Sequence, residues 1–182
     1  YDVSDANTNE AIQVTRTVIV QDTTVPVITL AGDAEVKIEV GSTYTDAGAT
    51  AEDNYDGDIT ASIVAVNPVD VNTVGSYTVT YDVSDANTNE AIQVTRTVIV
   101  QDTTVPVITL AGDAEVTIEV GSTYTDAEAT AEDNYDGDIT ASIVAVSTVD
   151  TDVVGSYTVT YDVSDANTNE AIQVTRTVIV QD

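Results

Sequence analysis

Apolar and polar residues alternate along most of the chain. The clearest example is residues 156–163, where Tyr157, Val159, Tyr161 and Val163 alternate with Ser, Thr and Asp. Successive side chains of a β-strand point to opposite faces, so this pattern predicts a strand with one buried face. The other alternating segments are rich in Val, Ile, Thr and Tyr, which favours strands over helices.

A long internal repeat organises the chain. The sequence YDVSDANTNEAIQVTRTVIVQD begins at Tyr1, Tyr81 and Tyr161, so the repeat period is 80 residues. A unit of this length suits a small independent domain. We therefore predict domains at residues 23–102 and 103–182, preceded by residues 1–22 as the last two strands of another domain. The two complete units differ at seven positions: Lys37/Thr117, Gly48/Glu128, Asn67/Ser147, Pro68/Thr148, Val71/Thr151, Asn72/Asp152 and Thr73/Val153.

Each complete unit is expected to contain about seven short strands. Turn residues such as Gly and Asn separate the alternating segments. Seven short strands in a unit of this size are typical of a β-sandwich, so the predicted fold class is all-β. In the second unit we expect strands near residues 105–110, 114–120, 123–132, 139–146, 149–154, 156–165 and 170–180.

An arginine interrupts the apolar pattern at the same place in every copy, as Arg16, Arg96 and Arg176. Strict alternation puts Arg176 on the same face as Val174 and Val178. We expect either a β-bulge or an arginine stem that crosses the rim of the sandwich, with the guanidinium paired to a carboxylate.

Composition narrows the possible functions. The chain has 32 Asp and Glu against 4 Lys and Arg, a formal net charge of -28, and no Cys, His, Trp or Phe. Disulfides, structural zinc sites and catalytic triads are therefore excluded. The acidic charge disfavours binding to nucleic acids and direct contact with anionic membranes. We expect no enzyme, because a glycosidase-like carboxylate pair needs a cleft and aromatic platforms.

Acidic residues are densest at residues 52–58 and 132–138. In the predicted sandwich each of these loops lies beside the preceding linker and the turn at residues 85–89 or 165–169. Calcium takes six to eight oxygen ligands, and a cation would offset the repulsion between these carboxylates. The alternative is that the acids are solvated and serve turn formation. We hypothesise one Ca²⁺ site at each domain junction, with Asp22, Asp53, Asp56, Asp58 and Asp85 in one and Asp102, Asp133, Asp136, Asp138 and Asp165 in the next.

Two segments of the second unit resemble a known family. They are PVITLAGDAEVTIEVGSTYTDAEATAEDNYDGDIT and VGSYTVTYDVSDANTNEAIQVTRTVIV. These segments resemble the Ig-like repeat of bacterial surface proteins, which is related to the hyalin repeat, and the resemblance extends to the first unit and to residues 1–22. It implies immunoglobulin-like sandwiches in tandem, an extracellular or cell-surface location and no catalytic residues. One departure is Asn-Thr-Asn at residues 87–89 and 167–169, where relatives usually carry Gly-Asn.

The leading functional hypothesis is a structural extender or stalk module of an adhesin-like surface protein. Its partners would be neighbouring repeats of the same protein, with junctions stiffened by calcium. One alternative is a subunit of an extracellular filament, a homopolymer built by head-to-tail or strand-complementation contacts, because an isolated hairpin at residues 1–22 would need a cover. Another is a calcium-dependent glycan-binding module that uses residues 133–138.

Overall fold

The structure is a computed structural model that describes all 182 residues. Contacts divide it into two compact units, one of residues 1–34, 47–67 and 79–96, the other of residues 35–46, 68–78 and 97–182. This division crosses the first repeat, whose strands β2 and β7 pair with each other. The only helices are two 3-10 turns of three residues, and neither is long enough to cross a lipid bilayer.

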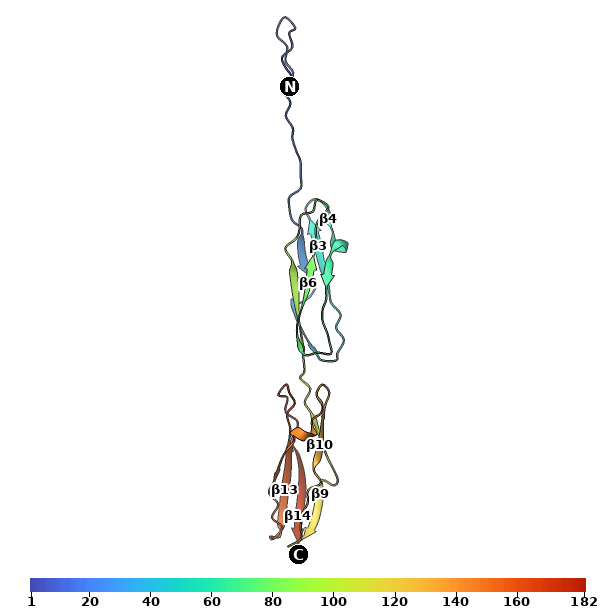
Figure 1. The fold of residues 1–182 in the computed structure, drawn as a ribbon, viewed down its shortest axis with the longest axis vertical. Coiled ribbons are helices and arrows are strands. Elements are labelled where there is room, and N and C mark those ends of the chain that lie inside the picture. Colours follow the sequence, from blue (N-terminus) through green and yellow to red (C-terminus); the bar gives the residue numbers. More distant parts are fainter. The chain divides into compact units, whose positions relative to one another are not determined.

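Both repeats contain the same elements in the same order (Figure 1). The first repeat has β1 (Val27–Leu30), β2 (Glu35–Glu39), β3 (Ala49–Asp53), β4 (Gly57–Asp58), η1 (Thr60–Ser62), β5 (Val64–Val66), β6 (Gly75–Asp82) and β7 (Val94–Gln101). The second has β8 (Val107–Leu110), β9 (Glu115–Glu119), β10 (Ala129–Asp133), β11 (Gly137–Asp138), η2 (Thr140–Ser142), β12 (Val144–Ser147), β13 (Gly155–Asp162) and β14 (Val174–Gln181).

Each repeat is built from a three-stranded and a four-stranded sheet. The strand orders are β1-β3-β4 and β2-β7-β6-β5 in the first repeat, and β8-β10-β11 and β9-β14-β13-β12 in the second. All neighbouring strands are antiparallel except β2 with β7 and β9 with β14, which are parallel. Two sheets that bury their inner faces against each other form a β-sandwich, which confirms the predicted fold class.

The core of the second repeat lies between its two sheets. The three-stranded sheet contributes Ile108 and Ala131, and the four-stranded sheet contributes Val159, Tyr161 and Val178. Val159 and Tyr161 are buried on β13, as the alternating pattern predicts, because inward positions on a strand recur every second residue.

Three of the strands expected in the second repeat differ in the structure, and the one expected at residues 123–132 begins only at Ala129. Residues 149–154 form no strand, and the two-residue strand β11 pairs with β10 instead. Here the Asp150 side chain accepts a hydrogen bond from the Asp152 N–H (3.0 Å), a local turn that competes with strand pairing. The expected strand at residues 139–146 is likewise shortened, because η2 occupies its beginning.

Residues 1–22 do not form the two strands expected of them. They contain one isolated bridge, Ser4 to Glu10, and Figure 1 draws them without arrows. Val18 and Val20 are 76% and 94% exposed, whereas their equivalents in β7, Val98 and Val100, are 0% and 1% exposed. β7 is paired between β6 and β2, whereas residues 1–22 contain only the isolated bridge.

The repeated arginine is buried inside the sandwich rather than at its rim. Arg176 is 1% exposed, and β13 and β14 pair through it without a bulge. Its Nε donates to the Asp113 carbonyl (2.9 Å) and its Nη1 donates to the Tyr161 hydroxyl (2.8 Å) and to the Asp126 carboxylate. The predicted ion pair with a carboxylate is therefore present in the second repeat.

Backbone carbonyls complete the arginine's surroundings in both repeats. Arg176 Nη2 donates to the carbonyls of Ala111 and Glu128. Arg96 is also 1% exposed, and it donates to the carbonyls of Asp33, Ala31 and Gly48 and to the Tyr81 hydroxyl. Each of these hydrogen bonds joins the arginine of β7 or β14 to a segment outside its own strand. The guanidinium therefore crosslinks several segments in the interior of the repeat.

Removing the guanidinium should destabilise the second repeat strongly. Arg176→Met leaves the Asp126 carboxylate and several carbonyls without their donor. We expect the free energy of unfolding to fall by about 3 kcal/mol, the lower end for a broken buried pair, because the Asp126 side chain is 23% exposed. Denaturant unfolding followed by circular dichroism measures it. The exposed Lys37→Thr is the control, with a change of about 0.5 kcal/mol or less, and a similarly small effect of Arg176→Met would contradict the structural role.

Asp126 should make the stability of the second repeat depend on pH. Burial alone would raise the pKa of Asp126, but hydrogen bonds from Tyr124, Tyr161 and Arg176 outweigh it and lower the pKa below 3.8. A depressed carboxyl pKa stabilises the fold above the unfolded-state value, and this contribution is lost as pH falls through the folded-state pKa. Unfolding measured from about pH 5 downward should show a steeper loss in the parent chain than in Asp126→Asn. Equal slopes would show that Asp126 is not the group responsible.

Glu128 occupies a backbone conformation that suits glycine. Its φ is 67°, and the equivalent residue of the first repeat is Gly48, with φ 75°. A residue with a Cβ is strained there. Glu128→Gly should therefore raise the free energy of unfolding by about 0.5–1 kcal/mol, and Gly48→Glu should lower it. Thermal melts of both variants test the pair, and a loss of stability in Glu128→Gly would be the opposite result.

Candidate cation site

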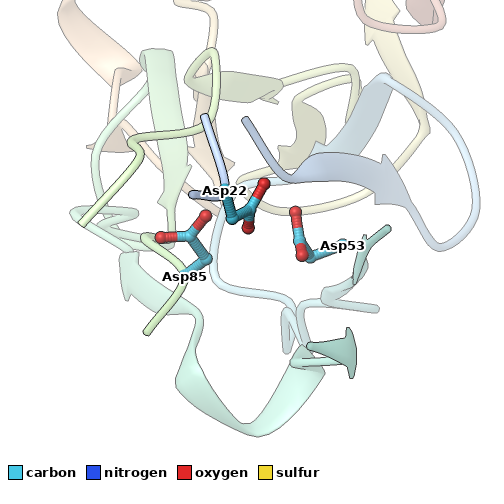
Figure 2. Close-up of side chains that lie close together, drawn as sticks. All are labelled: Asp22, Asp53 and Asp85. Atoms are coloured by element: carbon cyan, nitrogen blue, oxygen red, sulfur yellow. The ribbon is translucent and has the colours of Figure 1, made fainter. Parts of the chain in front are cut away.

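Two clusters of three aspartates, called here the aspartate clusters, stand out. Within each, one carboxylate oxygen from every member lies within 4.8 Å of the others. Figure 2 shows the first cluster, in which the three carboxylates converge on one another. Cluster 1 consists of Asp22, Asp53 and Asp85, and cluster 2 consists of Asp102, Asp133 and Asp165.

Three segments of one repeat bring each cluster together. Asp102 precedes β8, Asp133 is the last residue of β10, and Asp165 lies in the turn that follows β13. Because β10 and β13 belong to different sheets, the cluster joins both sheets at one end of the repeat. Cluster 1 has the same arrangement eighty residues earlier.

Backbone hydrogen bonds hold the aspartate side chains in place. Asp133 Oδ1 accepts from the N–H groups of Tyr135 (2.8 Å) and Asp136 (3.0 Å). Asp165 Oδ1 accepts from the Asn169 N–H at 2.7 Å. Such side-chain to backbone bonds are why Asp is favoured in turns. The corresponding bonds from Asp56 and Tyr55 lower the pKa of Asp53.

One oxygen in each cluster has no hydrogen-bond partner. Oδ2 of Asp53 and Oδ2 of Asp133 are buried and accept no hydrogen bond. The two residues are only 7% and 8% exposed. A buried carboxylate oxygen without a donor is unfavourable and uncommon, so it demands an explanation.

Like charges are concentrated in the buried clusters. Burial raises the pKa of Asp102, and the charges of Asp133 and Asp165 raise it further, although hydrogen bonds from Asn167 and Thr104 act in the opposite direction. Two of the chain's cations have carboxylate partners outside the clusters: Arg176 binds Asp126, and Lys37 lies 3.8 Å from Glu35.

Asparagine amides partly compensate the negative charge. Asn169 Nδ2 donates to Asp165 Oδ2 (2.7 Å) and to the Asp102 carbonyl (3.2 Å), and Asn167 Nδ2 donates to Asp102 Oδ2 (3.0 Å). Asn87 and Asn89 do the same in cluster 1. The sequence predicted that this turn lies beside the acidic loop, but not that its asparagine amides bind the aspartates. The recurrence of these asparagines beside the same aspartate in every copy was the available signal.

The structure places six of the ten predicted ligands in the clusters and gives the other four different contacts. Asp58 and Asp138 are exposed, and each accepts from the N–H of Thr60 or Thr140 at the start of the 3-10 turn. Hydrogen bonding to the side chain of that threonine, and then to its N–H, lowers the pKa of each aspartate. Asp56 and Asp136 accept from the N–H of Ala86 and Ala166, so they join the acidic loop to the neighbouring turn.

The backbone of the turn at residues 167–169 has the geometry that glycine adopts most easily. Thr88 and Thr168 have φ of 68° and 69°. A β-branched residue is strained at such angles and glycine is not. The turn therefore keeps the geometry for which glycine is suited.

Similar proteins include one curated protein and several solved structures. Hyalin of Strongylocentrotus purpuratus is 34% identical over 184 residues, which are 94% of the chain but only 15% of hyalin. A lipoprotein of Bacteroides thetaiotaomicron is 17% identical over 83% of this chain and 99% of that chain, with a TM-score of 0.39. The M60 catalytic domain with two CBM51 domains of Clostridium perfringens ZmpB is 12% identical over 100% of this chain and 33% of that chain, with a TM-score of 0.43.

The family model described as "Bacterial surface protein, Ig-like domain" matches residues 28–100 and 108–180. The two matches lie in tandem and cover most of the chain, which confirms the resemblance inferred from the sequence. They cover the sandwich strands of both repeats except for one residue at each end of each match. The chain therefore belongs to the bacterial surface protein Ig-like domain family.

Proposed function

We propose that this chain is a spacer segment of an extracellular or cell-surface protein, in which tandem Ig-like repeats hold another part of that protein away from the surface. The observation that carries the proposal is the near-identity of the two repeats. They share the core, the buried arginine and the aspartate cluster, and they differ at seven positions. A spacer needs one stable unit repeated, whereas a unique binding site requires one copy to differ.

The seven differences spare the aspartate clusters and concentrate at the other end of the repeat. Five of them fall at residues 67–73 and their equivalents at 147–153. This segment keeps the same backbone contact in both copies: the Gly41 N–H donates to the Val71 carbonyl (2.7 Å) and the Gly121 N–H to the Thr151 carbonyl (2.8 Å). One backbone pairing does differ: the Thr148 N–H donates to the Thr158 carbonyl (3.0 Å), whereas its equivalent Pro68 has no N–H to donate.

A carboxylate at the end of β2 binds the residues that follow β7. Glu39, at the end of β2, accepts hydrogen bonds from the N–H and hydroxyl groups of both Thr103 and Thr104. Bonds from Thr103, with further bonds from Thr104, lower the pKa of Glu39 to about 2. This supports the proposal, because the segment is neither Gly/Ser-rich nor free of contacts, as a flexible linker would be.

A spacer should lengthen in proportion to its number of repeats. We expect the maximum dimension from small-angle X-ray scattering to grow by a constant increment of at least about 30 Å, the size of a compact unit of this length, for each extra copy of residues 103–182 added to the chain. A chain with residues 23–102 in place of residues 103–182 is the matched control, and it should have the same dimension as the parent.

Two results would count against the spacer. Added copies that leave the maximum dimension unchanged would show that the repeats collapse on one another. Retention of the parent chain on a glycan array, lost when only one of the two repeats is altered in its loops, would show a copy-specific binding function instead.

A further inference from the structure

We propose that each aspartate cluster is a binding site for one Ca²⁺ ion, so that the chain binds two. Each site takes one carboxylate from the residue that leads into the repeat, one from the end of β3 or β10, and one from the turn after β6 or β13. Such binding depends on the clusters alone and is independent of a spacer function.

The spacing of the carboxylate oxygens suits calcium. Calcium binds oxygen at about 2.3–2.6 Å, so ligands on opposite sides of the ion lie about 4.6–5.2 Å apart. Three oxygens that lie within 4.8 Å of one another can all contact one such ion. Magnesium requires ligand distances of about 2.0–2.1 Å and a regular octahedron, which limits opposite ligands to about 4.2 Å. Oxygen-only ligands also exclude a preference for soft metals.

The unpartnered Oδ2 atoms of Asp53 and Asp133 are a second, independent indication of a ligand. Both residues are more than nine-tenths buried, and Figure 2 shows the Asp53 carboxylate directed toward those of Asp22 and Asp85. Oδ1 of each is already fixed by two backbone N–H groups, which leaves Oδ2 as the available atom. A cation supplies the missing partner without disturbing the loop.

The neighbouring asparagines can complete the coordination. In the structure the amide Nδ2 groups of Asn167 and Asn169 face Asp102 and Asp165. An amide carries an acceptor oxygen opposite its nitrogen, so rotation of the amide presents Oδ1 to a cation in place of Nδ2. Calcium accepts such carbonyl-type oxygens and water beside carboxylates to reach six to eight ligands.

The chain should hold two sites and not three. Residues 1–22 repeat the turn, with Asp5 accepting from the Asn9 N–H and side chain. Asp5 belongs to neither cluster, because no second and third carboxylate converge on it. Asp22 leads into the first repeat and Asp102 leads into the second. An ion bound at each cluster would join that aspartate to the loops of the repeat it enters, and so fix the direction in which the chain enters the repeat.

Calorimetric titration of the 182-residue chain with Ca²⁺ is the first test. We expect a stoichiometry of about two, and a rise in melting temperature on the order of 10 °C when free Ca²⁺ is 100-fold above its Kd. Mg²⁺, and NaCl at the same ionic strength, should produce much smaller shifts.

Two aspartates of the same loop provide a matched pair of variants. Asp133→Asn keeps Oδ1 as the acceptor for Tyr135 and Asp136 but removes a cluster carboxylate, so the stoichiometry should fall to about one. In chelator its melting temperature should equal or exceed that of the parent chain, because one of three repelling charges is gone. Asp138→Asn makes the same charge change outside the cluster and should retain both sites.

The sign of the stability change separates a cation site from a structural role. Asp133→Asn should be less stable than the parent chain in Ca²⁺ but no less stable in chelator, whereas a structural aspartate would lower stability in both. If Asp133→Asn fails to fold, Asp102→Asn repeats the test from outside the loop. Absence of binding heat and of a melting shift would overturn the proposal. Equal responses to Mg²⁺ or NaCl, or equal losses in Asp133→Asn and Asp138→Asn, would also overturn it, because they indicate diffuse charge screening.

Discussion

The buried arginine of each repeat is the interaction on which the sandwich depends. Arg176 lies inside the core beside Val178, yet its guanidinium is bound by carbonyls, a tyrosine hydroxyl and the Asp126 carboxylate. A buried cation is tolerated only where its donors are satisfied, so the segments that carry those acceptors must take one arrangement. The chain has no Cys, Trp or Phe, so this polar centre replaces the disulfide and large aromatic contacts that stabilise many sandwiches.

Charge is handled in opposite ways at the two buried polar centres. At Arg176 a cation is matched by an anion and by backbone dipoles. At the aspartate clusters three carboxylates converge, asparagine amides give partial compensation, and one oxygen remains without a donor. Burial penalises uncompensated charge, so the arginine centre is complete within the chain while the aspartate centre is not. That difference is why the clusters point to an external ligand and the arginine does not.

Repetition connects these centres to function. Both complete repeats carry the same buried arginine and the same aspartate cluster. Five of their seven differences fall in one segment, which keeps its backbone bond to Gly41 or Gly121. A unit that is copied with its buried polar centres intact is suited to being added or removed as a whole. This fits a module that adds length to a protein rather than one specialised binding surface. The high negative charge also opposes association between copies.

The sequence alone determined the all-β class, the 80-residue period and the family, because alternation and self-similarity are local properties visible in one dimension. It also identified the acidic loops that hold Asp53 and Asp133. Tertiary structure decided which acidic residues converge. Asp133 and Asp138 lie in the same acidic loop of the sequence, but the Asp138 side chain accepts from the Thr140 N–H at the start of η2 and does not join the cluster. Tertiary structure likewise placed Arg176 inside the core and left residues 1–22 without strands, because a carbonyl cage and pairing neighbours come from segments distant in the chain.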